Sequence, residues 1–296
     1  MDLVIGIPAY NEENNIASII LKLQKITNQI IVCDDGSTDM TAEIAEKLGV
    51  IVIQHEKNFG YGAAIRSIFQ KTKELNFDIL VTFDADGQHR VSDIQTVVEP
   101  IIKNIADIVV GSRFLKSGKN EVPDYRKFGI KIITKITNVS LNEKLTDSQS
   151  GFRAYSRKAL SELFPSDYGM GVSTEILIKA SNKGLKIAEV PIKILYEGET
   201  STHDPVSHGV SVILSTMKFI SIEHPLKFYG MPGIVLSVIG LFFVVWTMQY
   251  FAEFDMFPPV LALISIGTTL LGVVFLVTGT MLYSLVNVVR ERHNTK

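Results

Sequence analysis

Short apolar runs alternate with amphipathic stretches along the first two hundred residues of the chain. Such runs predict buried strands, and apolar residues recurring three and four positions apart predict helices. The predicted strands cover residues 3–8, 30–33, 50–54, 78–83, 108–111 and 190–196. The predicted helices cover residues 14–25, 41–48 and 62–75. Strands separated by helices of this length indicate right-handed crossovers, so we expect an α/β fold with a mostly parallel sheet.

Polar residues gather where three of these strands end. Pro8, Tyr10 and Glu12 stand at the end of the first strand, and residues 34–39 (DDGSTD) follow the second. Ligands of parallel sheets bind beyond the carboxyl ends of the strands, which predicts one shared site for these clusters. Taken singly, each of the two clusters is explained equally well as a cap for the helix behind it.

The third cluster, residues 83–89 (FDADGQH), follows an apolar run and brings two carboxylates close together. Asp84 and Asp86 stand two positions apart, so both leave the strand end on the same side. Paired hard oxygen ligands in this place suit Mg²⁺ or Mn²⁺ holding a diphosphate. An Asp-Gly turn after an edge strand is the alternative for an isolated pair. The two neighbouring clusters favour the metal site.

Two long apolar segments lie at the other end of the chain. Residues 228–252 and 256–289 contain no charged residue. Because about 20 apolar residues cross a bilayer, we predict membrane spans over roughly 231–251 and 260–286. A buried helical hairpin inside a soluble core is the alternative.

The charges around these segments predict an orientation. Residues 253–259 between the two spans include two acidic residues and neither Lys nor Arg, whereas Arg290, Arg292 and Lys296 follow the second span. The positive-inside rule therefore places the tail and the N-terminal domain in the cytoplasm of a multi-pass cell-membrane protein.

Overall composition excludes several classes of protein. A net charge of −2 gives no global basicity that would point to nucleic acid as a partner. Cys33 is the single cysteine, which excludes an internal disulfide framework and fits a reducing compartment. The chain starts with a strand-like run, so we expect no signal peptide.

Four strings of residues, in this order and spacing, resemble glycosyltransferase family 2. They are IPAYNE, DDGSTDMT, DADGQH and GSR, and the likeness spans residues 1–200. It implies the GT-A nucleotide-sugar-binding fold. Within the family the chain is most similar to the dolichyl-phosphate sugar synthases, which implies a nucleotide-sugar donor and dolichyl or polyprenyl phosphate as acceptor.

The resemblance also implies roles for individual residues. The residues implied to contact the nucleotide are Pro8, Tyr10, Glu12 and Asp35. The residues implied to coordinate the divalent ion are Asp84, Asp86 and Gln88. Arg113, in the GSR string, is implied to contact phosphate, a role that suits a guanidinium. A surface arginine that ends a strand is the alternative for Arg113.

Residues 124–139 predict a basic amphipathic helix. Its lysines recur every four residues at Lys127, Lys131 and Lys135, and its apolar stripe consists of Phe128, Ile132, Ile136 and Val139. Such a helix lies well on an anionic bilayer, although a solvated face packed on the domain is the ordinary alternative. The resemblance favours the bilayer and implies that Arg126 meets the acceptor phosphate. Ile130 stands where the family commonly has a hydroxyl residue.

Residues 147–153 (DSQSGFR) resemble the family's D-x-x-x-G-F-R string. The likeness implies that Asp147 lies beside the anomeric carbon and that Arg153 binds the acceptor phosphate or the product diphosphate. A loop aspartate that caps a helix is the alternative for Asp147. Residues 198–204 carry no Lys or Arg where many relatives have a basic loop, and His203 or His208 is a candidate replacement.

We therefore expect a GT-A catalytic domain over residues 1–205, an interfacial helix over 206–229, a membrane hairpin over 230–289 and a basic tail over 290–296. The expected reaction is direct transfer of a hexosyl unit to a lipid phosphate with inversion, since an anionic phosphate needs little deprotonation to attack. An enzyme that extends a lipid-linked glycan at a hydroxyl is the first alternative, and it would need Asp147 as general base. A non-catalytic membrane partner is the second, and the paired carboxylates speak against it.

Overall fold

A computed structural model describes residues 2–115, 124–194, 214, 217–218, 220–222 and 224–294, leaving aside the side chains of residues 124–126 and 289–294. The chain divides into two compact units, Met1–Thr216 and Met217–Lys296, and each is considered by itself. The loop 198–204 with His203, the residue His208 and the terminal Lys296 lie outside the described residues. The domain boundaries expected at residues 205 and 229 stay predictions.

In the described part of the first unit, seven strands form one sheet in the order β3-β2-β1-β4-β6-β5-β7. Its strands are β1 (Leu3–Ala9), β2 (Ile30–Asp34), β3 (Ile51–Gln54), β4 (Ile79–Thr82), β5 (Ile108–Ser112), β6 (Arg153–Ser156) and β7 (Ile187–Pro191). Four of the six pairings are parallel, and the two that involve β6 are antiparallel. The expectation of a mostly parallel sheet in an α/β fold is confirmed.

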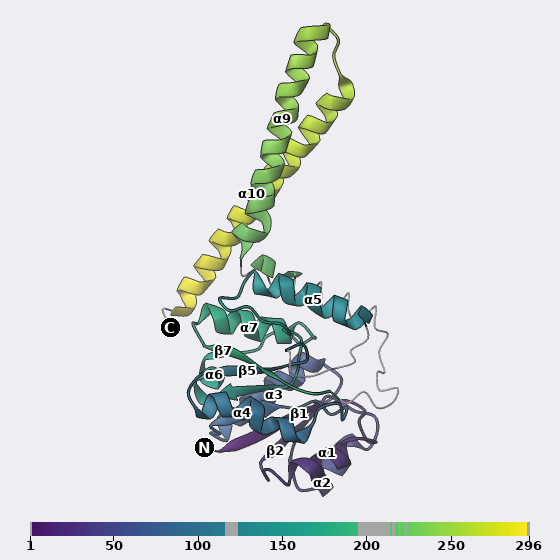
Figure 1. The fold of residues 1–296 in the computed structure, drawn as a ribbon, viewed down its shortest axis with the longest axis vertical. Helices are drawn as coiled ribbons and strands as arrows, with labels where there is room; N and C mark the ends of the chain where they lie inside the picture. Colours follow the sequence, from purple (N-terminus) through teal and green to yellow (C-terminus); the bar gives the residue numbers. More distant parts are fainter. Residues whose placement is uncertain are drawn as a thin grey trace. The chain divides into compact units, whose positions relative to one another are not determined.

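Helices cover both faces of this sheet (Figure 1). One face packs on α1 (Ile16–Leu23), α2 (Thr41–Lys47) and α4 (Ile94–Ile102). The other packs on α3 (Tyr61–Glu74), α6 (Arg157–Glu162) and α7 (Val172–Asn182). The strands β1, β2 and β4 are buried on both sides, as expected for strands that read as continuous apolar runs.

Two strands differ from the sequence prediction. β6 was not predicted, because Arg153–Ser156 is short and begins with a charged residue. The burial of Arg153 depends on carbonyl partners that the sequence does not reveal. β7 begins three residues before the predicted start at residue 190, because residues Ile187 to Glu189 pair with β5. Residues 195–196 of the predicted strand lie outside the described residues.

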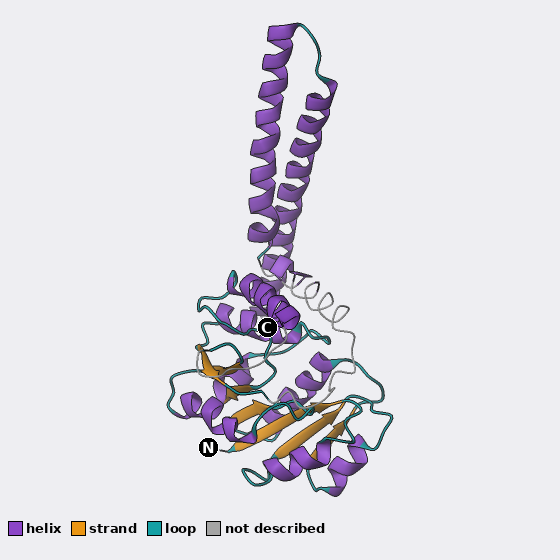
Figure 2. Cartoon of the chain, turned by 45° about the vertical axis from the view of Figure 1, so that its right-hand side comes forward, coloured by secondary structure: helices purple, strands orange, loops and turns teal. Residues whose placement is uncertain are grey.

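The second unit contains the helices α9 (Met231–Phe254) and α10 (Pro259–Asn294), which run side by side (Figure 2). Two helical segments, Leu226–Phe254 and Pro259–Val288, are long and apolar enough to cross a membrane. Only 17% and 11% of their most apolar windows are buried. That exposure disfavours the alternative of a hairpin hidden in a soluble core.

Small residues line the contact between α9 and α10. A Cβ atom built on Gly240 would lie 2.6 Å from the backbone nitrogen of Thr269, and one built on Gly272 would lie 2.6 Å from that of Ser237. The two backbones therefore approach more closely than larger side chains would allow. Close approach through small residues is the usual way in which apolar helices associate when lipid replaces water.

Candidate functional site

The loops after β1 and β2 are tied together at the carboxyl edge of the sheet. The Asn11 N–H donates to Ser37 Oγ over 2.8 Å, and the Thr38 N–H donates to Asn11 Oδ1 over 2.9 Å. Asn11 has a φ of 54°, in the left-handed region that asparagine tolerates better than most residues. The two polar clusters predicted to share an edge therefore lie next to each other.

Asp84 and Asp86 follow β4 at the same edge, and their surroundings push their pKa values in opposite directions. Burial raises the pKa of Asp86, and the negative charge of Asp84 raises it further. Burial also raises the pKa of Asp84, but hydrogen bonds from His89 and Tyr61 outweigh it and leave the pKa of Asp84 below its usual range. The charge of Asp84 therefore affects the protonation of Asp86.

The other predicted donor residues of the β1 and β4 loops differ in burial, and two of them interact with this pair. Pro8 is buried within β1, whereas the Tyr10 ring is 39% exposed. Burial raises the pKa of Glu12; the hydrogen bond from Asn15 opposes this, and the charge of Asp86 adds to it. Gln88 is half-buried, and its N–H donates to Asp86 Oδ1 over 3.0 Å. Glu12 and the β4 carboxylates thus form one negatively charged region.

This region fits a divalent cation that shares its ligands with a diphosphate. Among the described residues, no group of three His, Cys, Asp or Glu side chains is arranged to hold a metal ion alone. Mg²⁺ in phosphate-transfer sites usually takes one or two carboxylates, and water and phosphate oxygens complete its shell. Asp84 and Asp86 supply such a pair, and a cation between them would relieve the repulsion that raises the pKa of Asp86.

Asp35 faces into the protein. Its carboxylate accepts from His55 Nδ1 over 2.6 Å, from the Phe59 N–H over 3.1 Å and from the Gly60 N–H over 2.7 Å. The residue is 3% exposed. Both oxygens are thus engaged by the chain itself, which does not support the predicted contact with the nucleotide. Asp35 instead fixes the start of α3.

Cys33 lies beneath this network. It is fully buried, and its Sγ is 3.6 Å from Nε2 of His55. Burial, together with the charges of Asp35 and Asp34, raises the pKa of the Cys33 thiol to about 12. The thiolate is the reactive form of cysteine, so this thiol is chemically quiet.

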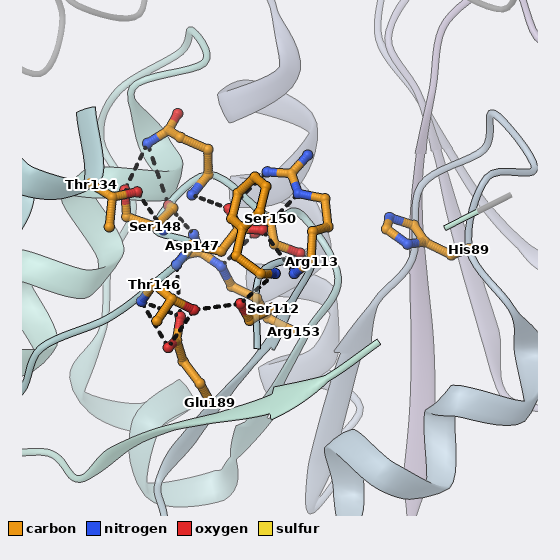
Figure 3. Close-up of polar contacts among 12 residues, drawn as sticks. His89, Ser112, Arg113, Thr134, Thr146, Asp147, Ser148, Ser150, Arg153 and Glu189 are labelled. Carbon is orange, nitrogen blue, oxygen red and sulfur yellow. Dashed lines mark hydrogen bonds and ion pairs between the residues drawn. The ribbon is translucent and has the colours of Figure 1, made fainter. Parts of the chain in front are cut away.

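Arg113 and Asp147 bind each other. Nε of Arg113 lies 2.6 Å from Oδ2 of Asp147, and Nη2 lies 2.7 Å from Oδ1, a two-point ion pair (Figure 3). Burial raises the pKa of Asp147, but the Arg113 charge and hydrogen bonds outweigh burial and hold the pKa of Asp147 below its usual range. The side chain of Asp147 is fully buried, and that of Arg113 is 16% exposed.

Glu189 of β7 supports this ion pair from below. Its carboxylate accepts from the backbone N–H groups of Thr146 and Asp147 over 2.8 Å each. Ser112 Oγ lies 2.6 Å from Thr146 Oγ1, which ties the end of β5 to the same turn (Figure 3). These contacts fix the backbone of Asp147, whose side chain pairs with Arg113.

Arg153 lies in the protein interior. It is 1% exposed, and its guanidinium donates to the carbonyl oxygens of Ser148, Ser150 and Ser173 over 2.8 Å each. A cation held in this way stabilises the turn between Asp147 and β6. The predicted role of Arg153 in binding acceptor phosphate or product diphosphate is not supported, because its guanidinium faces carbonyl groups rather than the surface.

Residues 4–164, more than half of the chain, match the protein family described as Glycosyl transferase family 2. The chain belongs to glycosyltransferase family 2. This membership confirms the resemblance that its four strings indicate, and it makes the protein a glycosyltransferase. The paired carboxylates and the Arg113–Asp147 pair lie within the matched residues.

Individual relatives agree with this assignment. The UDP-N-acetylglucosamine–dolichyl-phosphate N-acetylglucosaminyltransferase of Methanococcus voltae is 39% identical over 230 residues, which cover 70% of this glycosyltransferase and 89% of the relative. The dolichyl-phosphate hexose transferase of Haloferax volcanii is 30% identical over 228 residues, covering 76% and 96%.

Solved structures show the same fold. Glucosyl-3-phosphoglycerate synthase from Mycobacterium tuberculosis, in complex with UDP, superposes with a TM-score of 0.59. The match has 23% sequence identity and covers 74% of this glycosyltransferase and 79% of that chain. The predicted GT-A fold is therefore confirmed.

In this glycosyltransferase the predicted amphipathic helix is α5 (Asp124–Asn138). It packs on the domain through Ile133, Thr134 and Thr137, which are buried. Phe128 and Val139, from the predicted apolar stripe and its end, are 68% and 62% exposed. The three lysines are also exposed. Arg126 falls in the first turn of α5, and its side chain lies outside the described residues.

The sequence prediction missed several residues that hold the site together. His89 stands in the DADGQH string itself, and this position is the signal that could have marked it as a site residue. Tyr61, His55 and Glu189 carry no such signal, because each meets its partner only through the fold.

Proposed function

We propose that this glycosyltransferase moves a hexosyl unit from a nucleotide sugar to dolichyl or polyprenyl phosphate, in a single displacement with inversion at C1. The names of the two archaeal relatives support a dolichyl phosphate acceptor. The name of the relative from Methanococcus voltae supports a nucleoside-diphosphate sugar as donor. The two exposed apolar helices support a substrate that resides in a bilayer.

The observation that carries the choice of acceptor is the state of Asp147. A hydroxyl acceptor needs a general base within hydrogen-bond reach, and Asp147 was the predicted candidate. Its carboxylate is fully buried and engaged at both oxygens by Arg113, and its pKa lies below the usual range. A base in this state accepts a proton poorly. A phosphate acceptor is already anionic at neutral pH and needs no base, so the structure favours lipid phosphate over a hydroxyl.

The proposed chemistry moves electrons without moving a proton. An acceptor phosphate oxygen forms the new bond to C1 of the sugar while the bond from C1 to the diphosphate oxygen breaks on the opposite face. The electron pair leaves with the nucleoside diphosphate, and the products are a lipid phosphodiester and that diphosphate. Arg113, fixed in direction by Asp147, contributes positive charge beside the departing phosphates.

In this proposal the edge formed by the β1 and β4 loops binds the donor. The residues assigned to the nucleotide sugar are Tyr10, Glu12, Asp84, Asp86 and Gln88, with Pro8 shaping the turn. Asp84, Asp86 and Gln88 are assigned as the protein ligands of the ion. A bound Mg²⁺ or Mn²⁺ would supply positive charge that stabilises the leaving diphosphate.

The proposed location is the cell membrane, with the catalytic domain in the cytoplasm. α9 has 24 residues, which extend about 36 Å and exceed the roughly 30 Å of hydrocarbon in a bilayer. Arginines follow the second span, and the turn between the spans is acidic. The exposed lysines and apolar residues of α5 would rest on the anionic surface and bring Arg126 towards the acceptor phosphate.

A donor and acceptor screen in membranes tests this function. Radiolabelled GDP-mannose, UDP-glucose and UDP-N-acetylglucosamine are each supplied with dolichyl phosphate or with free dolichol, in Mg²⁺, in Mn²⁺ or after chelation. We expect transfer from one donor to dolichyl phosphate only, and loss of transfer after chelation. Asp86→Ala should abolish transfer while the protein stays folded, because a partly exposed site ligand contributes little to stability.

Three outcomes would contradict the proposal in different ways. Equal transfer to dolichol and dolichyl phosphate would favour the hydroxyl-acceptor alternative. Full activity in metal-free enzyme would remove the divalent ion from the mechanism. No transfer from any nucleotide sugar, with the protein folded, would leave the binding-partner alternative.

A further inference from the structure

Both oxygens of the Asp84 carboxylate are held by side chains that come from different elements. The Tyr61 hydroxyl, at the start of α3, donates to Oδ1 over 3.3 Å. Nε2 of His89, five residues along the chain from Asp84, donates to Oδ2 over 3.0 Å. Because one donor contacts each oxygen, the carboxylate plane is fixed and not only its position.

The backbone closes a further side of this carboxylate. A Cβ atom on Gly151 would lie 2.7 Å from Oδ2 of Asp84 and 2.7 Å from the Tyr61 hydroxyl. The Gly151 carbonyl accepts from Thr82 Oγ1 over 2.6 Å, so this part of the chain is itself tied to the end of β4. The Asp84 side chain therefore has little room to rotate.

Within the part of the chain that the structure describes, the buried His89 ring makes one polar side-chain contact, the hydrogen bond to Asp84. It is 8% exposed and packs against Phe83 and Phe152, at centroid distances of 5.7 Å and 5.0 Å. Its other nitrogen, Nδ1, is buried and has no hydrogen-bond partner in the described structure. An unpaired buried nitrogen is costly, and an aromatic hydrocarbon ring would fill the same space without that cost. The bond to Asp84 is the polar contact that a phenyl ring could not make.

We propose that His89 is a positioning residue of the donor site, acting with Tyr61 to hold the Asp84 carboxylate in the orientation that binds a divalent ion together with Asp86. The inference rests on the proposed function, in which this ion carries the nucleotide sugar. Hydrogen bonds from neighbouring groups orient ligating carboxylates in metal sites generally, and their loss weakens metal affinity about 10–100-fold.

Three substitutions separate this role from simple packing. His89→Phe keeps an aromatic ring between Phe83 and Phe152 but removes the donor. His89→Gln keeps an N–H donor of similar reach in a smaller side chain. Tyr61→Phe removes only the hydroxyl that contacts Oδ1. Thr72→Val is the matched control, because it removes a buried hydroxyl from the same helix as Tyr61, and the Thr72 hydroxyl donates to the Ile68 carbonyl over 2.7 Å, away from Asp84.

The measurement is Mn²⁺ affinity of the full-length protein in detergent, read from the electron paramagnetic resonance signal of free Mn²⁺ in the presence of UDP or GDP. We expect His89→Phe to weaken Mn²⁺ binding about 10–100-fold. Tyr61→Phe should weaken it less, since its bond is longer. His89→Gln should recover most of the affinity, and Thr72→Val should bind as the wild type does. Thermal unfolding without metal monitors the fold of each variant.

The outcomes distinguish this inference from the proposed function. If the wild type binds no Mn²⁺ with either nucleotide, the metal role in the proposed function is wrong, and this inference fails with it. If Asp86→Ala loses Mn²⁺ while His89→Phe and Tyr61→Phe bind as the wild type does, the metal role stands and the inference is overturned. Should His89→Phe not fold, the comparison of Tyr61→Phe with Thr72→Val decides, and equal Mn²⁺ affinity in these two variants overturns the inference.

Discussion

Two aspartates at the carboxyl edge of the sheet, Asp86 and Asp147, have pKa values that are shifted in opposite directions. Asp86 is half-buried, and Asp147 is fully buried. The pKa of Asp86 is raised by burial and by the charge of Asp84, whereas Arg113 holds the pKa of Asp147 below its usual range. The two residues are therefore suited to different tasks. Asp147 is held ionised by Arg113 and orients that guanidinium, and Asp86 gains from a positive partner.

The first prediction concerns Asp147→Asn. The ionised carboxylate favours the folded state because the pKa of Asp147 is lowered on folding. Its contribution is complete above the ordinary aspartate pKa of about 3.9 and is lost as pH falls through the lower folded value. Breaking a buried ion pair costs about 3–5 kcal/mol, so we expect the variant to unfold at a clearly lower temperature at pH 7. Thermal melts in detergent measure the difference.

The control for this prediction is Glu43→Gln, which breaks an exposed pair with Lys47. Exposed pairs contribute about 0–1 kcal/mol, so the control should melt close to the wild type. The gap between wild type and Asp147→Asn should narrow below about pH 4, because the wild type then loses the same charge. A gap that is absent at pH 7, or that grows in acid, would contradict the importance of the ion pair.

At the residue scale, the sequence predicted which acidic groups gather but not what faces them. Asp84 and Asp86 can be recognised in the sequence, because they stand two positions apart directly after an apolar strand. The role expected for Arg153 came from the likeness of residues 147–153 to the D-x-x-x-G-F-R string, and the sequence did not show that this guanidinium faces the interior. Its three carbonyl partners come from backbone turns whose direction no local pattern encodes.

At the scale of elements, α5 has one face that packs on the domain and one exposed face, and the sequence did not show which residues belong to each. The face that packs on the domain is narrow and partly polar, since Thr134 and Ser148 share a hydrogen bond of 3.1 Å across it. The helix therefore keeps Phe128 and the three lysines outside. Strand β6 is a comparable case, because a run of four residues that begins with Arg153 becomes a strand only through its two neighbours.

The second prediction tests α5 as a bilayer-facing helix. Replacing its lysines at 127, 131 and 135 by Gln removes attraction of about 1 kcal/mol each to an anionic surface. We expect the apparent KM for dolichyl phosphate to rise about a hundredfold in anionic nanodiscs and to change little in zwitterionic ones. Exposed lysines of the α1–α2 region, Lys22, Lys25 and Lys47, replaced by Gln form the control. Equal effects of both triple variants would contradict the assignment.

The third prediction concerns the contact between α9 and α10. Gly240→Leu would drive a side chain into the backbone of Thr269, because even a Cβ atom lies 2.6 Å from its nitrogen. Overpacking of this kind costs about 1–3 kcal/mol, so the hairpin should melt at a lower temperature in detergent. Gly267→Leu is the matched control, since a Cβ atom there meets nothing within 4 Å. Identical melting of the two variants would show that α9 and α10 do not pack as described.

At the scale of the whole molecule, the chain joins a glycosyltransferase domain to two exposed apolar helices. The sequence indicated the domain through strand–helix alternation and the resemblance of four strings, and it indicated the helices through two runs without charge. Runs without charged residues are directly visible in the sequence. The alternation of strands and helices can be recognised even when the predicted bounds of each element are wrong by a few residues. What composition does not determine is the side of the membrane on which each end lies, because that depends on a few charges.

The fourth prediction therefore concerns topology. A reporter fused after Lys296 should lie in the cytoplasm and one inserted beside Asp255 should lie outside, because arginines follow α10 and the connecting turn is acidic. Reporter activity in intact cells measures both. If both reporters lie on the same side, one apolar helix does not cross, whereas an exchange of sides would reverse the proposed orientation.

The buried state of Cys33 makes this glycosyltransferase a convenient subject for site-directed thiol labelling. The native thiol is fully buried and its pKa is raised to about 12, so a maleimide reagent at pH 7 meets almost no thiolate there. A cysteine introduced on α5, in the turn at Asp255 or along α9 would then be the reactive one without prior removal of Cys33. Fluorophores or spin labels placed in this way would report depth in the bilayer from a chain that keeps its natural core.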